Sequence, residues 1–237
     1  MSVWCEDEAG PYQTIPYPGH RWCRLGQHQP HEYFRDGTAK LLTLFHPVTG
    51  QVRVKGVTSS PNVVLHSWLK TELTAILAAL PPPEPHTAEA RRCIWHEWGR
   101  IGGLGMEYGR NPVPLRLLLV MDNLAGHKSG DWVSWCYQRG IMILYTPLGG
   151  SWLNMAESIQ RLLKRRALDG EHFLSVPPMI QALEAVADHW NQHATPFIWG
   201  GKRRERRRRA LCTHRLGGSG AVTARSVRAF YARLRPK

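Results

Sequence analysis

The segment Leu115-Arg116-Leu117-Leu118-Leu119-Val120-Met121-Asp122-Asn123 decides the fold of this 237-residue chain. It is a short, mostly apolar run that ends at an acid, which is typical of a strand buried on both faces of a sheet. Ile141 to Tyr145 has the same character and is closed by Pro147. A helical pattern over 128–138 separates the two runs, so the segment predicts strands and helices packed in layers.

The segments on either side predict an α/β domain with a mixed sheet flanked by helices. Alternating or continuous apolar runs indicate strands, and apolar residues recurring every three or four positions indicate helices. The strands are expected at 3–8, 41–46 and 51–55, and the last two form an antiparallel hairpin around the turn 47–50. The helices are expected at 62–80, 87–100, 154–167 and 177–191, and the first has Asn62 as N-cap and is stopped by Pro81. The connections are expected at 9–38 and 102–114.

The charge of the chain is concentrated at its C-terminal end. The formal net charge is +13, and residues 202–237 hold thirteen Lys and Arg against one acid, Glu205. Residues 1–201 therefore have a net charge of only +1. This division predicts a nearly neutral domain, 1–201, and an Arg-rich tail, 202–237. A dense Arg run favours contacts with nucleic-acid phosphates, and a merely solubilising tail is the alternative. The candidate phosphate-binding residues are Lys202, Arg203, Arg204, Arg206, Arg207, Arg208 and Arg209.

Composition excludes several classes of protein. The 43% hydrophobic and 21% charged fractions are typical of a globular domain rather than a disordered chain. No run approaches the length of a membrane span, so no membrane partner is expected. The first residues lack the basic start and apolar core of a signal peptide, and the five Cys form no C-x-x-C pair. We expect a reducing cytosol, without a disulfide framework or a zinc knuckle.

Carboxylates lie at the ends of two expected core strands. Asp7 ends the first strand and Asp122 follows the apolar run. Ligands of open α/β sheets bind at the carboxyl ends of strands, where an acid needs a partner or a metal. Glu6 and Glu8 compete with Asp7, and because side chains alternate along a strand, only one parity can serve. Asp122 could instead form an Asx turn, since Asp-Asn before Gly126 is also turn chemistry.

The third candidate acid is Glu157, at the start of an expected helix. Asn154-x-x-Glu157 has the form of a capping box. Arg161 follows four residues later and offers a helical ion pair of about 0.3–0.5 kcal/mol. These are structural explanations of Glu157. However, Glu157, Arg161 and Arg165 share one helical stripe, with Lys164 beside it. One acid among bases suits a metal ion next to a phosphate backbone.

These acids and their surroundings resemble the motifs of the DDE transposases of the mariner-like bacterial insertion-sequence family. Asp122 and Glu157 are separated by 34 residues, as in many members. Asp7-Glu8 resembles the first Asp-Glu pair of the family. Asp122-Asn123 with His127 resembles its Asp-Asn-x-x-x-His motif, and Asn154 to Glu157 its Asn-x-x-Glu motif. The resemblance covers roughly residues 1–200 and implies a ribonuclease-H-like fold.

The resemblance also implies a mechanism with two metal ions. Asp7, Asp122 and Glu157 would be the catalytic residues and would bind two Mg²⁺ or Mn²⁺ ions, whose preferred ligands are oxygens. The implied activity is DNA cleavage and strand transfer at insertion-sequence ends. It would take place in the bacterial cytoplasm, on the nucleoid, in a homodimer or a higher synaptic assembly on DNA.

Three neighbouring residues would support these acids. His127 could orient a phosphate or a metal-bound water, or could be a helix-start residue with a satisfied hydrogen bond. Asn123 could support Asp122 or simply be a turn residue. Asn154 belongs to the third motif.

Two other functions remain open at this level. The chain could be another ribonuclease-H-like nuclease, such as an RNA–DNA hybrid hydrolase, or a catalytically idle fragment that binds nucleic acid through its tail. Full-length relatives also carry N-terminal helix-turn-helix modules, whereas the first motif here begins at residue 7. We therefore expect an upstream reading frame that supplies such a module as a partner or fusion, or a truncated copy. Weak, sequence-nonspecific DNA binding by this chain follows.

Overall fold

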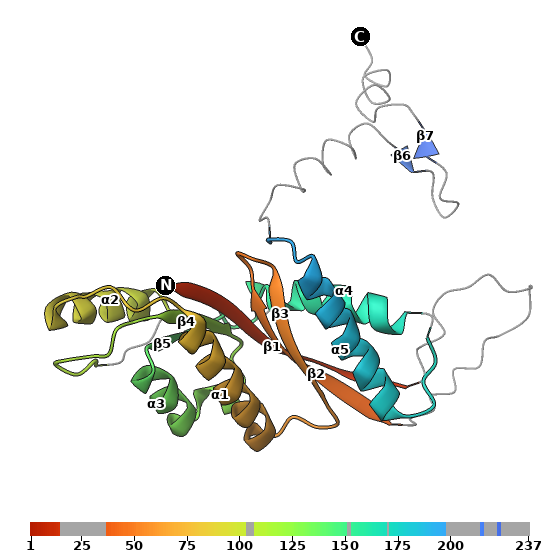
Figure 1. The fold of residues 1–237 in the computed structure, drawn as a ribbon, viewed down its shortest axis with the longest axis horizontal. Coiled ribbons are helices and arrows are strands. Elements are labelled where there is room, and N and C mark those ends of the chain that lie inside the picture. Colours follow the sequence, from red (N-terminus) through yellow and green to blue (C-terminus); the bar gives the residue numbers. More distant parts are fainter. Residues whose placement is uncertain are drawn as a thin grey trace, which may run out of the picture. The chain divides into compact units, whose positions relative to one another are not determined.

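The computed structural model describes residues 1–14, 37–102, 107–150, 153–169 and 171–197, and the backbone of two short strands nearer the C-terminus. The chain divides into two compact units, Met1–Pro196 and Phe197–Lys237. In the second unit, strands β6 (His214–Arg215) and β7 (Val222–Thr223) pair antiparallel. The first unit contains the sheet and the helices that carry the candidate site (Figure 1).

A five-stranded mixed sheet forms the centre of the first unit, with the strand order β3-β2-β1-β4-β5. The first three strands pair antiparallel, and the last two run parallel to β1. The predicted mixed α/β architecture is confirmed, and it is consistent with a ribonuclease-H-like fold. The strands are β1 (Ser2–Gln13), β2 (Thr38–His46), β3 (Gln51–Val57), β4 (Leu117–Met121) and β5 (Ile141–Tyr145).

Helices cover both faces of this sheet. On one face, Trp4 of β1 and Leu44 of β2 belong to one buried cluster with Leu69 of α1 and Trp132 of α3. On the other face, the Gln160 side chain of α4 donates a hydrogen bond to Thr43 of β2, and α5 packs on β3 (Figure 1). The helices are α1 (Asn62–Ala79), α2 (Ala88–Ile101), α3 (Gly130–Gln138), α4 (Ala156–Leu168) and α5 (Val176–Gln192), with a 3₁₀ turn, η1, at Gly126–Lys128.

The alternation of side chains along β1 separates its acids. The irregularity in its pairing with β2 lies between Ala9 and Tyr12, so the strand is regular before that point. Glu6 and Glu8 therefore share the face of Trp4, which α1 and α3 cover, whereas Asp7 lies on the face of α4.

Two boundaries predicted from the sequence were wrong. β1 continues to Gln13 because its pairing with β2 extends to Thr38, so Asp7 lies within the strand rather than at its end. Asn62 is the first residue of α1, and Pro61, in an extended conformation, is the N-cap. The prediction used the apolar pattern within each segment, which contains neither the pairing of β1 with β2 nor the conformation of Pro61.

Gly56 of β3 tests the close packing of the sheet against α5. A Cβ at this position would overlap the Cγ2 methyl of Ile180 and would lie 3.0 Å from its Cβ. Gly56→Ala should therefore lower the free energy of unfolding by about 1–3 kcal/mol, measured by urea denaturation. Gly130→Ala is the matched control, because a Cβ at this first residue of α3 would have no neighbour within 4 Å. It should be neutral or stabilising by up to about 1 kcal/mol. Equal losses of stability in both variants would contradict the close approach.

Candidate active site

The parallel pairing of β1 and β4 places two acids at the same level of the sheet. Cys5 pairs with Val120, so Asp7 and Asp122 both lie two residues beyond this pair. Asp122 follows the last residue of β4, and both acids are half-buried. Burial, together with the smaller effect of the negative charges of Glu157 and Asp122, raises the pKa of Asp7 to about 7, against a hydrogen bond from the Glu8 amide that lowers it. Asp7 therefore lies within electrostatic reach of both other predicted acids.

Glu157 reaches this position because Asn154 fixes the start of α4. The buried Asn154 side chain donates a hydrogen bond to the Glu6 carbonyl of β1 and accepts one from the Ala156 amide at 3.1 Å. It thereby joins the helix to the strand that carries Asp7. The capping-box interpretation was wrong, because Met155 is the N-cap. Among the described residues, Glu157 also forms no ion pair with Arg161.

The three acids suit divalent cations. Their donor atoms are carboxylate oxygens, which Mg²⁺ and Mn²⁺ prefer. The pKa of Asp7 is raised by burial first and by the charges of Glu157 and Asp122 second, so ionising Asp7 in the folded chain is costly. Bound cations would remove that cost. Among the described residues, however, the group whose donor atoms all lie within 4.8 Å of one another is Glu6, Glu8 and His127 rather than these three acids.

On the other face of β1, Glu6 and Glu8 surround the buried His127. His127 Nε2 lies 3.6 Å from Glu6 Oε2 and 3.8 Å from Glu8 Oε1. Its Nδ1 lies 2.8 Å from Asp122 Oδ1. Asp122 is thus held from this face by His127 while its charge also reaches Asp7 on the other. His127 is supported by several groups rather than by one helix-start hydrogen bond.

Neighbouring charges favour the charged forms of His127 and Glu8 in this second cluster, whereas burial favours the neutral form of Glu6. Burial opposes a charge on His127, but Glu8, Glu6 and Asp122 outweigh it and raise its pKa to about 9. Burial raises the pKa of Glu6 to about 8, although His127 pulls it down. For Glu8, burial is outweighed by His127 and by the Ser60 hydroxyl, which donates a hydrogen bond at 3.0 Å, so its pKa is lowered.

Sequence reasoning treated Glu6 and Glu8 as rivals of Asp7 and missed their own cluster. The signal was present, because three consecutive acids in a strand must alternate between its faces. If Asp7 lies on one face, its two neighbours enter the other and need a cation there. In the structure this cation is His127, which belongs to η1. The sequence does not predict the contact, because no local pattern shows which face of the sheet η1 covers.

The loop after β4 is held by short polar contacts. The Leu124 amide donates a hydrogen bond to Asp122 Oδ1 at 3.0 Å, so the expected Asx turn also exists. The Asn123 side chain donates to the Thr146 carbonyl, and Tyr145 donates its hydroxyl to the His127 carbonyl at 2.6 Å. Asn123 therefore ties the end of β4 to the end of β5.

Residues 105–180 match the family model of the DDE superfamily endonucleases. The match includes Asp122, His127, Asn154 and Glu157 and supports a DDE endonuclease domain, for which divalent-metal-dependent nuclease chemistry is implied. It spans less than half of the chain and does not include Asp7. No curated protein gives a significant match to the chain.

Basic side chains follow Glu157 along α4. Arg161, Lys164 and Arg165 are all exposed on this helix. The candidate phosphate contacts from Lys202 to Arg209 lie outside the described residues.

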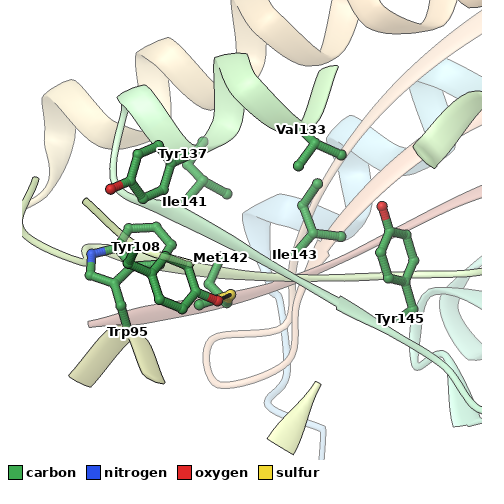
Figure 2. A pocket seen from close by; sticks show the side chains of 8 residues that line it. All are labelled: Trp95, Tyr108, Val133, Tyr137, Ile141, Met142, Ile143 and Tyr145. Atoms are coloured by element: carbon green, nitrogen blue, oxygen red, sulfur yellow. Dashed lines mark hydrogen bonds between the residues drawn. The ribbon is translucent and has the colours of Figure 1, made fainter. Parts of the chain in front are cut away.

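A small cavity elsewhere in the first unit does not resemble a substrate site. It encloses about 30 Å³ beside α2, α3 and β5, and Trp95, Tyr137 and Met142 are among its apolar and aromatic lining (Figure 2). A cavity of this size holds at most a few water-sized molecules, and its apolar and aromatic walls offer few partners for a polar substrate. None of the helices in the described ranges combines the length and the hydropathy needed to cross a bilayer.

The clustering of acids predicts a pH-dependent stability for the metal-free protein. The pKa of Asp7 is raised from 3.8 to about 7, so its favourable contribution is complete below pH 3.8 and is lost as the pH rises through 7. Asp7→Asn removes the charge and keeps the shape. In EDTA this variant should have a higher Tm than the parent at pH 8 and no such advantage at pH 4.

Asp169→Asn, at the exposed C-cap of α4, is the control for this measurement. It should change the Tm by the same small amount at both pH values. A lower Tm for Asp7→Asn at pH 8 would contradict the repulsion among the three acids.

Proposed function

We propose that this chain is the catalytic part of a mariner-like insertion-sequence transposase, which cleaves DNA at the element ends and joins them to a target. The observation that carries the proposal is that the charges of both Asp122, just after β4, and Glu157, in α4, act on Asp7 of β1. The DDE endonuclease match over two of these acids supports it.

In this proposal the three acids bind two Mg²⁺ or Mn²⁺ ions. Bound there, the cations would activate a water or a 3′-hydroxyl and stabilise the leaving oxygen of an in-line displacement at phosphorus. His127 positions Asp122 through the 2.8 Å contact of its Nδ1 with Oδ1. Asn154 positions Glu157 through its bond to the Glu6 carbonyl. These neighbours hold the carboxylates before DNA arrives, which lowers the cost of ordering the site.

DNA would lie along the basic side of α4. Arg161, Lys164 and Arg165 follow Glu157 on this helix and are exposed, so they can bind the phosphates next to the cleaved bond. The Arg-rich tail, 202–237, would add contacts that do not depend on base sequence. A homodimer or higher assembly would bring two DNA ends together on the nucleoid. A helix-turn-helix partner or fusion would read the ends.

Plasmid nicking tests the assignment of the acids. Supercoiled DNA should be nicked in Mg²⁺ or Mn²⁺ and not in EDTA. Asp122→Asn and Glu157→Gln should each lower the rate by more than about 100-fold, because each removes several kcal/mol of charge stabilisation. The exposed Glu171 lies beyond α4, so Glu171→Gln is the matched control and should retain the parent rate. Nicking that persists in both site variants would reject the assigned roles.

Other outcomes of the same assay separate the alternatives. Faster cleavage of an RNA–DNA hybrid than of duplex DNA would indicate a different ribonuclease-H-like nuclease. Binding without cleavage in any divalent metal would indicate an idle nucleic-acid-binding fragment.

Salt dependence tests the DNA surface of α4. The triple change Arg161→Ala, Lys164→Ala and Arg165→Ala should weaken duplex binding at every sequence. It should also reduce the slope of log K against log salt by about 0.9 for each phosphate that the variant no longer neutralises. Arg100→Ala, an exposed cation in the last turn of α2, is the control and should leave the slope unchanged. Equal slopes for the triple variant and the parent would place the DNA elsewhere.

A further inference from the structure

The cluster of Glu6, Glu8 and His127 has polar atoms that no hydrogen bond satisfies. Glu6 is 0% exposed, and neither of its carboxylate oxygens has a hydrogen-bond partner among the residues that the structure describes. His127 Nε2 is buried and equally without one. Such atoms are costly in a protein interior, so they call for a group that binds them.

The distances within this cluster leave room for an ion. The 3.6 and 3.8 Å separations of His127 Nε2 from Glu6 Oε2 and Glu8 Oε1 are too long for charged hydrogen bonds, which close to about 2.7–2.9 Å. The ligand atoms of the three residues lie within 4.8 Å of one another. Atoms so spaced can all lie near the roughly 2.0–2.2 Å at which zinc holds imidazole nitrogen and carboxylate oxygen.

Two of the three side chains are also held by a second partner. Asp122 Oδ1 lies 2.8 Å from His127 Nδ1, which leaves Nε2 facing the acids. Ser60 donates to Glu8 Oε2 and accepts from Lys40 at 2.9 Å, which leaves Glu8 Oε1 free to face Nε2. A carboxylate on the far nitrogen of a histidine is the usual support of a metal-binding imidazole.

We propose that Glu6, Glu8 and His127 form a zinc site, separate from the Mg²⁺ site of the proposed transposase and on the opposite face of β1. The imidazole ligand favours Zn²⁺ over Mg²⁺, which prefers oxygen alone. The separations also suit tetrahedral zinc, whose ligands lie about 3.3 Å apart, better than octahedral Mg²⁺, whose ligands lie about 2.9 Å apart. Through His127 the zinc would fix the orientation of Asp122.

The test measures bound metal rather than DNA cleavage, so it does not depend on the proposed function. The full-length, tag-free chain is stripped with EDTA and titrated with Zn²⁺, and its metal content is measured by mass spectrometry. Co²⁺ replacing zinc reports tetrahedral geometry through its visible absorption. The parent should bind one zinc ion. Glu6→Gln and His127→Gln should each weaken the affinity for zinc by more than about 100-fold. Asp122→Asn should weaken it by about 10–100-fold, because it removes the support of the imidazole.

Two controls keep the outcome clear. Asp7→Asn and Glu157→Gln remove none of the three proposed zinc ligands, so both should still bind one zinc ion. Circular dichroism and cooperative melting show which variants fold. Glu8→Gln, at a side chain that is 12% exposed, serves if Glu6→Gln does not fold. Failure of the parent to bind zinc, equal binding by His127→Gln, or an equally weakened affinity in Asp7→Asn would overturn the zinc site. Each of these results leaves the nicking assay unaffected.

Discussion

The parallel pairing of β1 with β4 is the constraint on which the candidate site depends. Cys5 lies opposite Val120, and this single register brings Asp7 level with Asp122. A shift by one residue would turn Asp7 toward the apolar cluster of α1 and α3 and would bring Glu6 or Glu8 to the α4 face. The register is fixed by burial, because Trp4 and Leu119 must both enter the same cluster. Packing of apolar residues on one face therefore sets the position of the acids on the other.

The acids oppose the stability that this packing provides. Asp122 and Glu157 both repel Asp7, and Glu6 is buried without a hydrogen-bond donor among the described residues. His127 offsets part of this cost, because a single imidazolium faces Glu6, Glu8 and Asp122. Sites that store such repulsion are typical of functional centres, since a structural role would be served as well by uncharged side chains. Both faces of β1 thus carry an incomplete charge balance that cations would complete.

Much of the fold could be predicted from local patterns. The apolar runs of β2, β4 and β5 are buried, and β3 is partly exposed, as their sequences indicate. The true end of β1 could not be predicted, because its last residues are strand only through pairing with Thr38 and Ala39. The role of Asn154 was also hidden. Its motif suggested a helix cap, whereas its side chain bonds to the Glu6 carbonyl, 148 residues away in sequence.

For the candidate site, the sequence by itself determined which acids compete and how they alternate along a strand. It also determined the spacing of Asp122 and Glu157 and the basic stripe that follows. Only the tertiary structure decided that Glu6 and Glu8 meet His127, and that Asp122 is shared between this cluster and Asp7. The physical reason is that strand alternation fixes relative faces but not what covers them. The covering elements, η1 and α4, are placed by long-range packing that no local pattern contains.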